Sequence, residues 1–218
     1  MNPFPQVLFH LGPLGVTDTV VVSLGLSLVL VLGARLAMAF PGPRSWLEVI
    51  YEVLERAVME LTTADVRPLV PLVLTLWLFI GAANLVSVLP RVPSPTRDLA
   101  LTAALALVSF LSGHVYAFRR RGVAYLRQYV QPTPLLLPFN VMGELSRTVA
   151  LALRLFGNAL SAGLIASIVL YLAGLLLPVP LLLLGVLTGV VQAYIFGVLT
   201  LVFAASSIQV ATKEEGTT

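Results

Sequence analysis

Residues 155–212 read LFGNALSAGLIASIVLYLAGLLLPVPLLLLGVLTGVVQAYIFGVLTLVFAASSIQVAT, a stretch of 58 residues without Asp, Glu, Lys or Arg. A helix needs about 20 apolar residues to cross the hydrocarbon core of a bilayer, so this stretch is long enough for two spans. Pro178 and Pro180 mark a turn between them. We therefore predict an all-α integral membrane protein whose last two helices form a long hairpin.

The composition of the whole chain agrees with that prediction. Of 218 residues, 58% are hydrophobic and only 11% are charged, whereas soluble domains carry about 25% charged residues. The chain has no cysteine and two distant histidines, His10 and His114, so we expect no metal site, no cofactor and no cysteine nucleophile. We assign the excess of basic residues to cytoplasmic loops rather than to nucleic-acid binding.

Five apolar segments are expected to span the membrane as one domain covering residues 1–218, and they are 19–40, 69–89, 99–118, 139–177 and 181–210. A helix over the fourth segment would be about 58 Å long, nearly twice the hydrocarbon thickness. We therefore expect it to tilt, to bend or to begin outside the bilayer.

Residues 44–63 form a different kind of segment. Apolar residues recur there at helical spacing, and most charged residues fall on the other side, including the acids Glu48, Glu52, Glu55 and Glu60. This pattern predicts an amphipathic helix at the membrane surface, where it contacts lipid. Lipid-surface helices favour Lys and Arg on the polar face, so an acidic face indicates a protein partner. A solvated face is the alternative.

Basic residues predict the orientation of the chain. They are frequent after the first span and after the third, where Arg119, Arg120 and Arg121 are consecutive, and they are absent before the first span and from the turn at 178–180. Because positive loops stay in the cytoplasm, we expect the N-terminus outside and the C-terminus inside.

The fourth span contains three ionisable residues, Glu144, Arg147 and Arg154. Glu144 and Arg147 are three residues apart and can form a structural ion pair near the helix start. Arg154 lies about 15 Å further along the helix, too far to pair with Glu144 directly, and the next acid in the sequence is Glu214. Arginine keeps its charge in proteins. Unless Arg154 snorkels to the headgroups, its counter-charge is expected on another subunit.

Other polar residues gather near Arg154. Arg147, Arg154, Asn158 and Ser161 share one helix face, and Gln192 shares a face of the last span with Thr188. The turn at 178–180 would set Arg154 and Gln192 at similar depth. These polar groups could serve ion flow or only join the helices.

Two sequence blocks resemble the a subunit of rotary F-type ATP synthases: SRTVALALRLFGN at 146–158 and QAYIFGVLT at 192–200. Weaker matches are Asn84, TRDL at 96–99 and HLGPL at 10–14. The resemblance covers nearly the whole chain. It implies a non-catalytic, ion-translocating Fo stator of the bacterial inner membrane, working beside a ring of c subunits and held by b-type subunits of the peripheral stalk.

The resemblance also implies roles for individual residues. Two half-channels would reach the c-ring carboxylate from opposite sides. Arg154 would separate them and lower the pKa of that carboxylate through its charge. Asn158 and Gln192 would line this region, with Glu144 and Arg147 as further candidates. The chain has no P-loop, so ATP chemistry would take place on other subunits.

The chain departs from the family at two glycines. Many members carry an acid or a histidine nine residues after the arginine and a compensating one on the last helix, and these positions are Gly163 and Gly185 here. We therefore expect the outer half-channel to be lined by water at the glycines or by the hydroxyls of Ser161, Ser167, Thr188 or Tyr194. Hydroxyls and water suit Na⁺ as well as H⁺, so a sodium-type branch is one interpretation.

Three other functions fit less of the sequence. A stand-alone ion channel or carrier would need its own counter-charge on the last two spans. A serine protease would need a base for Ser161, and His114 is predicted near the end of another span. A purely structural scaffold would not need Arg154.

Overall fold

The computed structural model describes residues 7–11, 14–61, 67–87, 92, 94–122, 125, 134–174 and 178–215. Two strands, β1 (Val7–Leu11) and β2 (Leu14–Thr17), form an antiparallel hairpin in which His10 is opposite Gly15. The helices that follow are α1 (Asp18–Ala39), α2 (Pro41–Leu61), η1 (Arg67–Leu69), α3 (Val70–Val86), η2 (Pro95–Arg97), α4 (Leu99–Arg121), η3 (Pro134–Leu136), α6 (Leu137–Ala173) and α7 (Pro178–Glu215).

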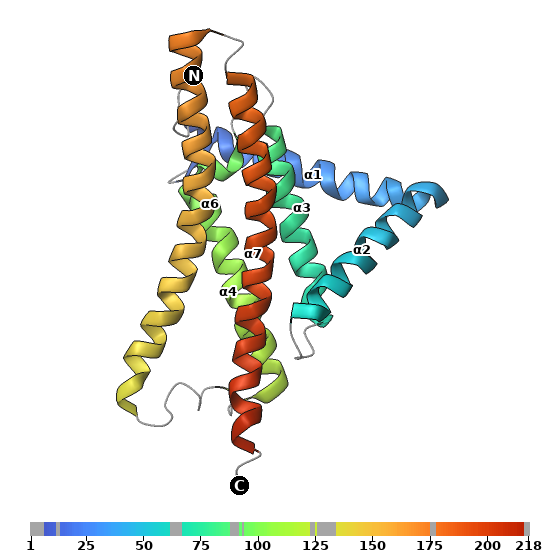
Figure 1. Ribbon diagram of the computed structural model, residues 1–218, viewed down its shortest axis with the longest axis vertical. Helices are drawn as coiled ribbons and strands as arrows, with labels where there is room; N and C mark the ends of the chain where they lie inside the picture. Colours follow the sequence, from blue (N-terminus) through green and yellow to red (C-terminus); the bar gives the residue numbers. More distant parts are fainter. Residues whose placement is uncertain are drawn as a thin grey trace.

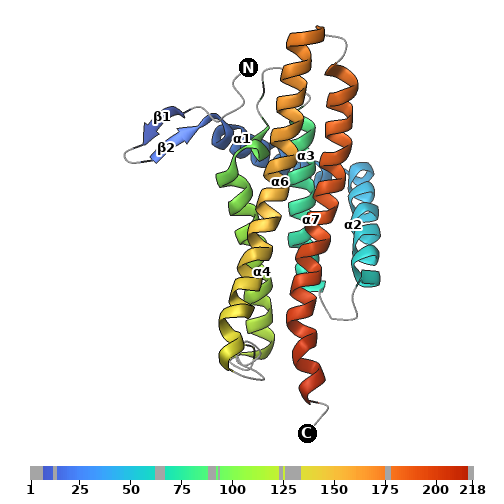
Figure 2. The same ribbon diagram turned by 60° about the vertical axis from the view of Figure 1, so that its left-hand side comes forward.

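The all-α membrane fold is confirmed. Among the described residues, five helices are long and apolar enough to cross a membrane, and they lie within the five predicted segments or extend them by a few residues. The small hairpin β1–β2 was not predicted. It projects to one side, close to the start of α1 (Figure 2).

Some helix ends differ from the predicted ones. α6 stops at Ala173 because Gly174 has a φ of +73° and its N–H bonds to the carbonyl of Leu170, a common way to end a helix. α7 begins at Pro178 instead of residue 181, since proline fits the first turn of a helix, where its missing N–H costs nothing. α6 is one uninterrupted helix of 37 residues, about 55 Å long.

The helices α3, α4, α6 and α7 run side by side along the long axis of the molecule (Figure 1). α7 packs against the other three, and α6 also packs against α4. α1 lies across this bundle and α2 returns toward α3 (Figure 1). The chain direction alternates, so the ends of α3 and α6 and the starts of α4 and α7 lie at one end of the bundle.

A packed layer crosses the middle of the bundle. Its buried side chains come from all four helices and are Leu76, Ile80, Ala106, Leu151, Ala152, Leu155, Ala193 and Phe196. A second cluster joins the start of α3 to the later part of α7. Outside these clusters large apolar side chains are exposed, as in Leu187 and Tyr171, which is the pattern expected where lipid or other membrane subunits cover the surface.

Close helix contacts depend on glycine in two places on α7. A Cβ on Gly197 would collide with the indole ring of Trp77 on α3. A Cβ on Gly189 would lie 2.7 Å from the side chain of Asn84, also on α3. Glycine therefore lets α3 and α7 approach closely at both levels.

Candidate functional site

Arg154 lies on an exposed part of α6. Its neighbour Leu153 is 50% exposed and Ile165, on the same helix face, is 49% exposed. In the described ranges no carboxylate forms an ion pair with Arg154. The cation therefore sits on a largely apolar face, and its counter-charge is not found in the described part of this chain.

The packed layer sets Arg154 and Gln192 at the same level, because their neighbours Leu155 and Ala193 belong to one buried cluster. Gln192 is buried, with 7% of its surface exposed. Its amide Nε2 has no hydrogen-bond partner among the described residues. Asn158 is half-buried one turn after Arg154. The structure thus places polar groups both on and behind the exposed face of α6.

A partly open cavity lies on one side of the packed layer, between α4, α6 and α7. It has about 20 Å³ of room for water, enough for roughly one molecule. We call it the cavity, and its polar lining consists of Ser109, His114, Glu144, Arg147, Thr148 and Thr200. Of these, only Glu144 and Arg147 were predicted as lining residues. The hydroxyls of Ser109 and Thr200 meet at 2.7 Å across α4 and α7, with both residues buried.

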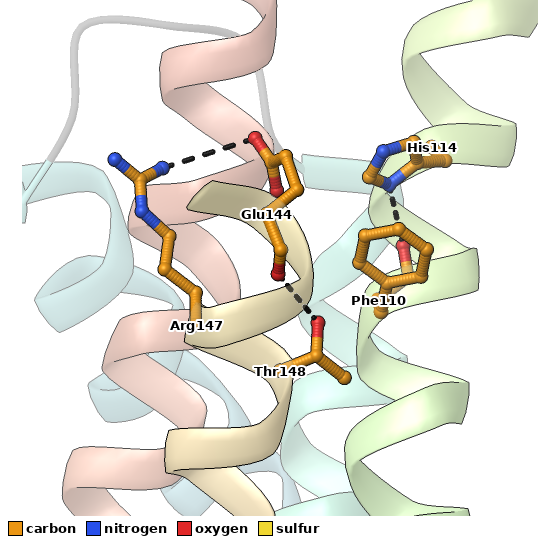
Figure 3. Close-up of polar contacts among 5 residues, drawn as sticks. All are labelled: Phe110, His114, Glu144, Arg147 and Thr148. Atoms are coloured by element: carbon orange, nitrogen blue, oxygen red, sulfur yellow. Dashed lines mark hydrogen bonds and ion pairs between the residues drawn. The ribbon is translucent and has the colours of Figure 1, made fainter. Parts of the chain in front are cut away.

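Glu144 and Arg147 form a loose ion pair at the cavity. The distance from Arg147 Nη1 to Glu144 Oε1 is 3.8 Å, and the side chains are 53% and 23% exposed, respectively. The guanidinium also lies 5.4 Å from the ring centre of Phe203. Figure 3 shows Glu144 on α6 between Arg147 and the α4 residue His114. The Nδ1 of His114 is 2.9 Å from the carbonyl of Phe110. Ionisable side chains of two helices therefore face the same space.

A polar junction lies on the other side of the packed layer. We call it the junction, and it comprises Asp18, Thr19, Asn84, Ser94, Thr96, Arg97 and Asp98, with Gly163 and Gly189. Asn84 Nδ2 donates to the carbonyls of Ile80 and Gly189, and Thr96 Oγ1 donates to Asn84 Oδ1. The hydroxyls of Ser94 and Thr96 meet at 2.8 Å. These bonds join α3, η2 and α7 in one buried network.

Side chains also lie beside both glycines noted in the sequence. A Cβ on Gly163 would lie 2.8 Å from Nη1 of Arg97, and a Cβ on Gly185 would lie 3.2 Å from Cβ of Ala162. Neighbouring side chains thus lie close to both glycines, and a lining of water at these positions stays a prediction. η2 is held against α1 as well, since Thr19 Oγ1 donates to Asp98 Oδ2 at 2.6 Å.

The four predicted hydroxyl residues are not linked to one another by hydrogen bonds in the described part of the chain. Ser167 donates to the carbonyl of Gly163, and Thr188 donates to carbonyls of its own helix. Tyr194 is 49% exposed, and its ring centre lies 5.3 Å from that of Trp77. Ser161 is exposed. They remain predicted lining residues.

The three regions follow one another along α6 and along α7. On α6 the cavity residue Glu144 is followed by Leu155 of the packed layer and then by Gly163 of the junction. On α7 the order is reversed, as it must be for an antiparallel helix, with Gly189 before Phe196 and Thr200. Two polar regions are thus separated by apolar packing at the level of Arg154.

Comparison with known proteins decides the family. A sequence model described as "ATP synthase A chain" matches residues 16–205. The chain belongs to the ATP synthase A chain family. It is 51% identical over 210 residues to ATP synthase subunit a 2 of Pelobacter propionicus. The alignment covers 94% of this chain and 92% of that relative.

Two further relatives of this ATP synthase subunit a family are similar over much of the chain. Identity is 43% over 212 residues to ATP synthase subunit a 1 of Hahella chejuensis, covering 95% of this chain and 91% of the relative. Identity is 49% over 154 residues to ATP synthase subunit a of Legionella pneumophila, and this alignment covers 70% of this chain and 67% of the relative. The predicted resemblance is confirmed, and the chain is a bacterial multi-pass membrane protein of the Fo sector.

Proposed function

We propose that this chain is the stator that carries ions past the c-ring of a rotary ATP synthase, through two half-channels separated by Arg154. The single observation that carries the proposal is the packed layer at the level of Arg154, with a polar region on each side of it. The chain itself performs no ATP chemistry. Ions pass between its two sides only by way of the ring.

Arg154 is the fixed charge in this scheme. It lies on an exposed, largely apolar face, so a c subunit can bring a membrane carboxylate against it. A cation within a few ångströms favours the ionised carboxylate and lowers its pKa. The same charge repels cations that approach along the face of α6, so the half-channels do not short-circuit. Asn158 and Gln192 support this region from α6 and α7.

The cavity belongs to the cytoplasmic half-channel and the junction to the outer one. α4 ends at the cavity side with the exposed basic residues Arg119 and Arg120, and basic segments stay in the cytoplasm. α1 begins at the junction, which puts the N-terminal side outside and the end of α7 inside. The exposed hydroxyl side chains of Ser161 and Thr188, with Ser167 and Tyr194, extend the outer route along α6 and α7.

Three surfaces of the chain are assigned to three partners: the c-ring, membrane lipid and a b-type subunit. The c-ring covers the face of α6 that carries Arg154, and lipid covers the remaining apolar surface. α2 lies at the membrane surface and presents Glu48, Glu52 and Glu60, all exposed, to a b-type subunit of the peripheral stalk. In this arrangement the whole chain is one membrane domain with five spans.

The test is ATP-driven ion uptake into vesicles that hold the whole complex, with Arg154→Ala compared with the wild type in H⁺ and in Na⁺ media. We expect uptake to vanish while the complex still assembles. The matched control is Arg35→Ala, which removes an exposed arginine of α1 and should leave uptake unchanged. Normal uptake in Arg154→Ala would contradict the proposal, and so would ion conduction by the isolated chain, which indicates a stand-alone channel.

A further inference from the structure

Arg97 reaches from η2 to the backbone of α6. A Cβ at Gly163 would lie 2.8 Å from its Nη1 and 3.2 Å from its Cδ. The Arg97 side chain therefore lies against α6 at Gly163, where this helix has no side chain of its own. The two residues are 66 positions apart, so only the fold brings this charge to α6.

The surroundings of Arg97 are partly buried and charged. Its Nε is buried and has no hydrogen-bond partner among the described residues. Burial lowers the pKa of Arg97, while the negative charge of Asp18 at the start of α1 acts in the opposite direction and raises it. An arginine nevertheless keeps its positive charge at neutral pH.

Asp98 completes the charged group. Its Oδ1 accepts a hydrogen bond from the N–H of Ala100 and its Oδ2 accepts one from Thr19. Asp98 is thereby fixed between α1 and α4. Two carboxylates and one guanidinium give this group a formal net charge of −1. Charges within about 10 Å act together on an ion, because salt does not screen them fully at that distance.

We propose that Arg97 sets the net charge of the junction and, through it, the affinity of the outer half-channel for a monovalent cation. This inference rests on the proposed function, since it needs ions to pass the junction. A net charge of −1 attracts a cation, and the guanidinium prevents the two carboxylates from holding it too tightly. Arg97 thus places a charged group beside Gly163, the position where many family members carry an acid or a histidine on this helix.

The test measures ATP synthesis by the purified complex in liposomes whose lumen corresponds to the outer side. The membrane potential is held constant, and the lumenal concentration of the driving cation is varied, Na⁺ or H⁺ as the wild type requires. Arg97→Met changes the net charge of the junction to −2 and should lower the half-saturating concentration. Asp18→Asn changes it to zero and should raise that concentration. Each shift is expected to be about three- to tenfold.

The double variant Arg97→Met with Asp18→Asn restores a net charge of −1. We expect its half-saturating concentration to lie within about twofold of the wild-type value, although both side chains have changed. Arg97→Lys keeps the charge and should also stay within about twofold of wild type. If Arg97→Met does not assemble, Arg97→Gln provides the same charge change.

A purely structural role for Arg97 predicts a different pattern. The variants would then lower the amount of assembled complex without moving the half-saturating concentration, or would move it in the same direction, and either result would overturn the inference. The outcome for Arg154→Ala is independent of this series. If Arg154→Ala abolishes uptake and the charge series shows no shift, the stator function stands and only the role of Arg97 is lost.

Discussion

The cavity and the junction lie on opposite sides of the same packed layer, but they are built in different ways. The cavity has room for water and an ion pair that is still 3.8 Å apart. In the junction, buried hydroxyl and amide groups bond to one another, and side chains rest on the bare backbone of Gly163 and Gly189. Under the proposed function, ions would reach the ring through open space on one side and past fixed charges on the other.

The difference has a physical origin. The cavity is bounded by three long helices whose side chains do not quite meet, so space is left beside Glu144 and Thr148. At the junction η2 fits among α1, α3, α4 and α6. A short turn brings many backbone groups close together, and these need hydrogen-bond partners when they are buried. The junction is therefore the more extensively hydrogen-bonded region.

The largest effect is expected from adding one methyl group in each half of the bundle. Gly189→Ala puts a Cβ 2.7 Å from the buried side chain of Asn84, whereas Gly113→Ala puts one 3.7 Å from Ala204 beside the cavity. Both changes favour the helix equally, but only the first overpacks it, at a cost of about 1–3 kcal/mol. Thermal denaturation of the purified complex should show a lower midpoint for Gly189→Ala alone. Equal midpoints for Gly189→Ala and Gly113→Ala would show that the junction is no more tightly packed than the cavity.

A smaller effect is expected from neutralising the acid of the cavity. Glu144→Gln removes the negative charge beside the cavity, which the proposed function assigns to the cytoplasmic half-channel, and the local cation concentration should fall by about tenfold or less. The rate of ATP-driven uptake at low cation concentration should fall by a similar factor and recover at high concentration. Arg35→Gln, which removes an exposed charge from α1, is the control and should leave the rate unchanged. Equal rates in the two variants would show that ions do not pass Glu144.

The smallest effect concerns the hydrogen bond between Ser109 and Thr200. Thr200→Val leaves the buried hydroxyl of Ser109 without this partner, and we expect a loss of about 1 kcal/mol in the stability of the complex. Thr75→Val removes a comparable bond to a carbonyl at an exposed position and should cost less than about 0.5 kcal/mol. Urea titration of the complex distinguishes the two. A similar cost at both sites would mean that the cavity wall is no more tightly bonded than the outer surface.

Much of the fold follows from the sequence alone. Charge-free runs predict the spans because charged side chains are expensive in hydrocarbon, and the proline turn predicts the hairpin of α6 and α7. The stop at Gly174 could have been predicted as well, since glycine after a helix commonly takes a positive φ. The hairpin β1–β2 was missed although the turn dipeptide Gly12-Pro13 lies between its strands, because two strands of five and four residues are too short for a clear alternating pattern.

The site was only partly predictable. Arg154 stands out as a charge within an apolar run. The contact of Arg97 with Gly163 and the bond between Ser109 and Thr200 depend on which helix faces meet, and a single sequence does not fix that. Gln192 was expected to be important, but its burial at 7% exposure became visible only when α7 was placed against the rest of the bundle.

The proposal of two half-channels separated at Arg154 is best tested by measuring the access of water to each side of the packed layer. The chain has no cysteine, so single cysteines can be introduced at Thr148 in the cavity, Arg97 in the junction and Leu155 in the layer. Their reaction with a membrane-impermeant thiol reagent is then compared in inverted and right-side-out vesicles. We expect Thr148→Cys to react only in inverted vesicles and Arg97→Cys to react only in right-side-out vesicles. Leu155→Cys should react in neither. Reaction of Thr148→Cys from both sides, or of Leu155→Cys from either, would contradict two half-channels separated at Arg154.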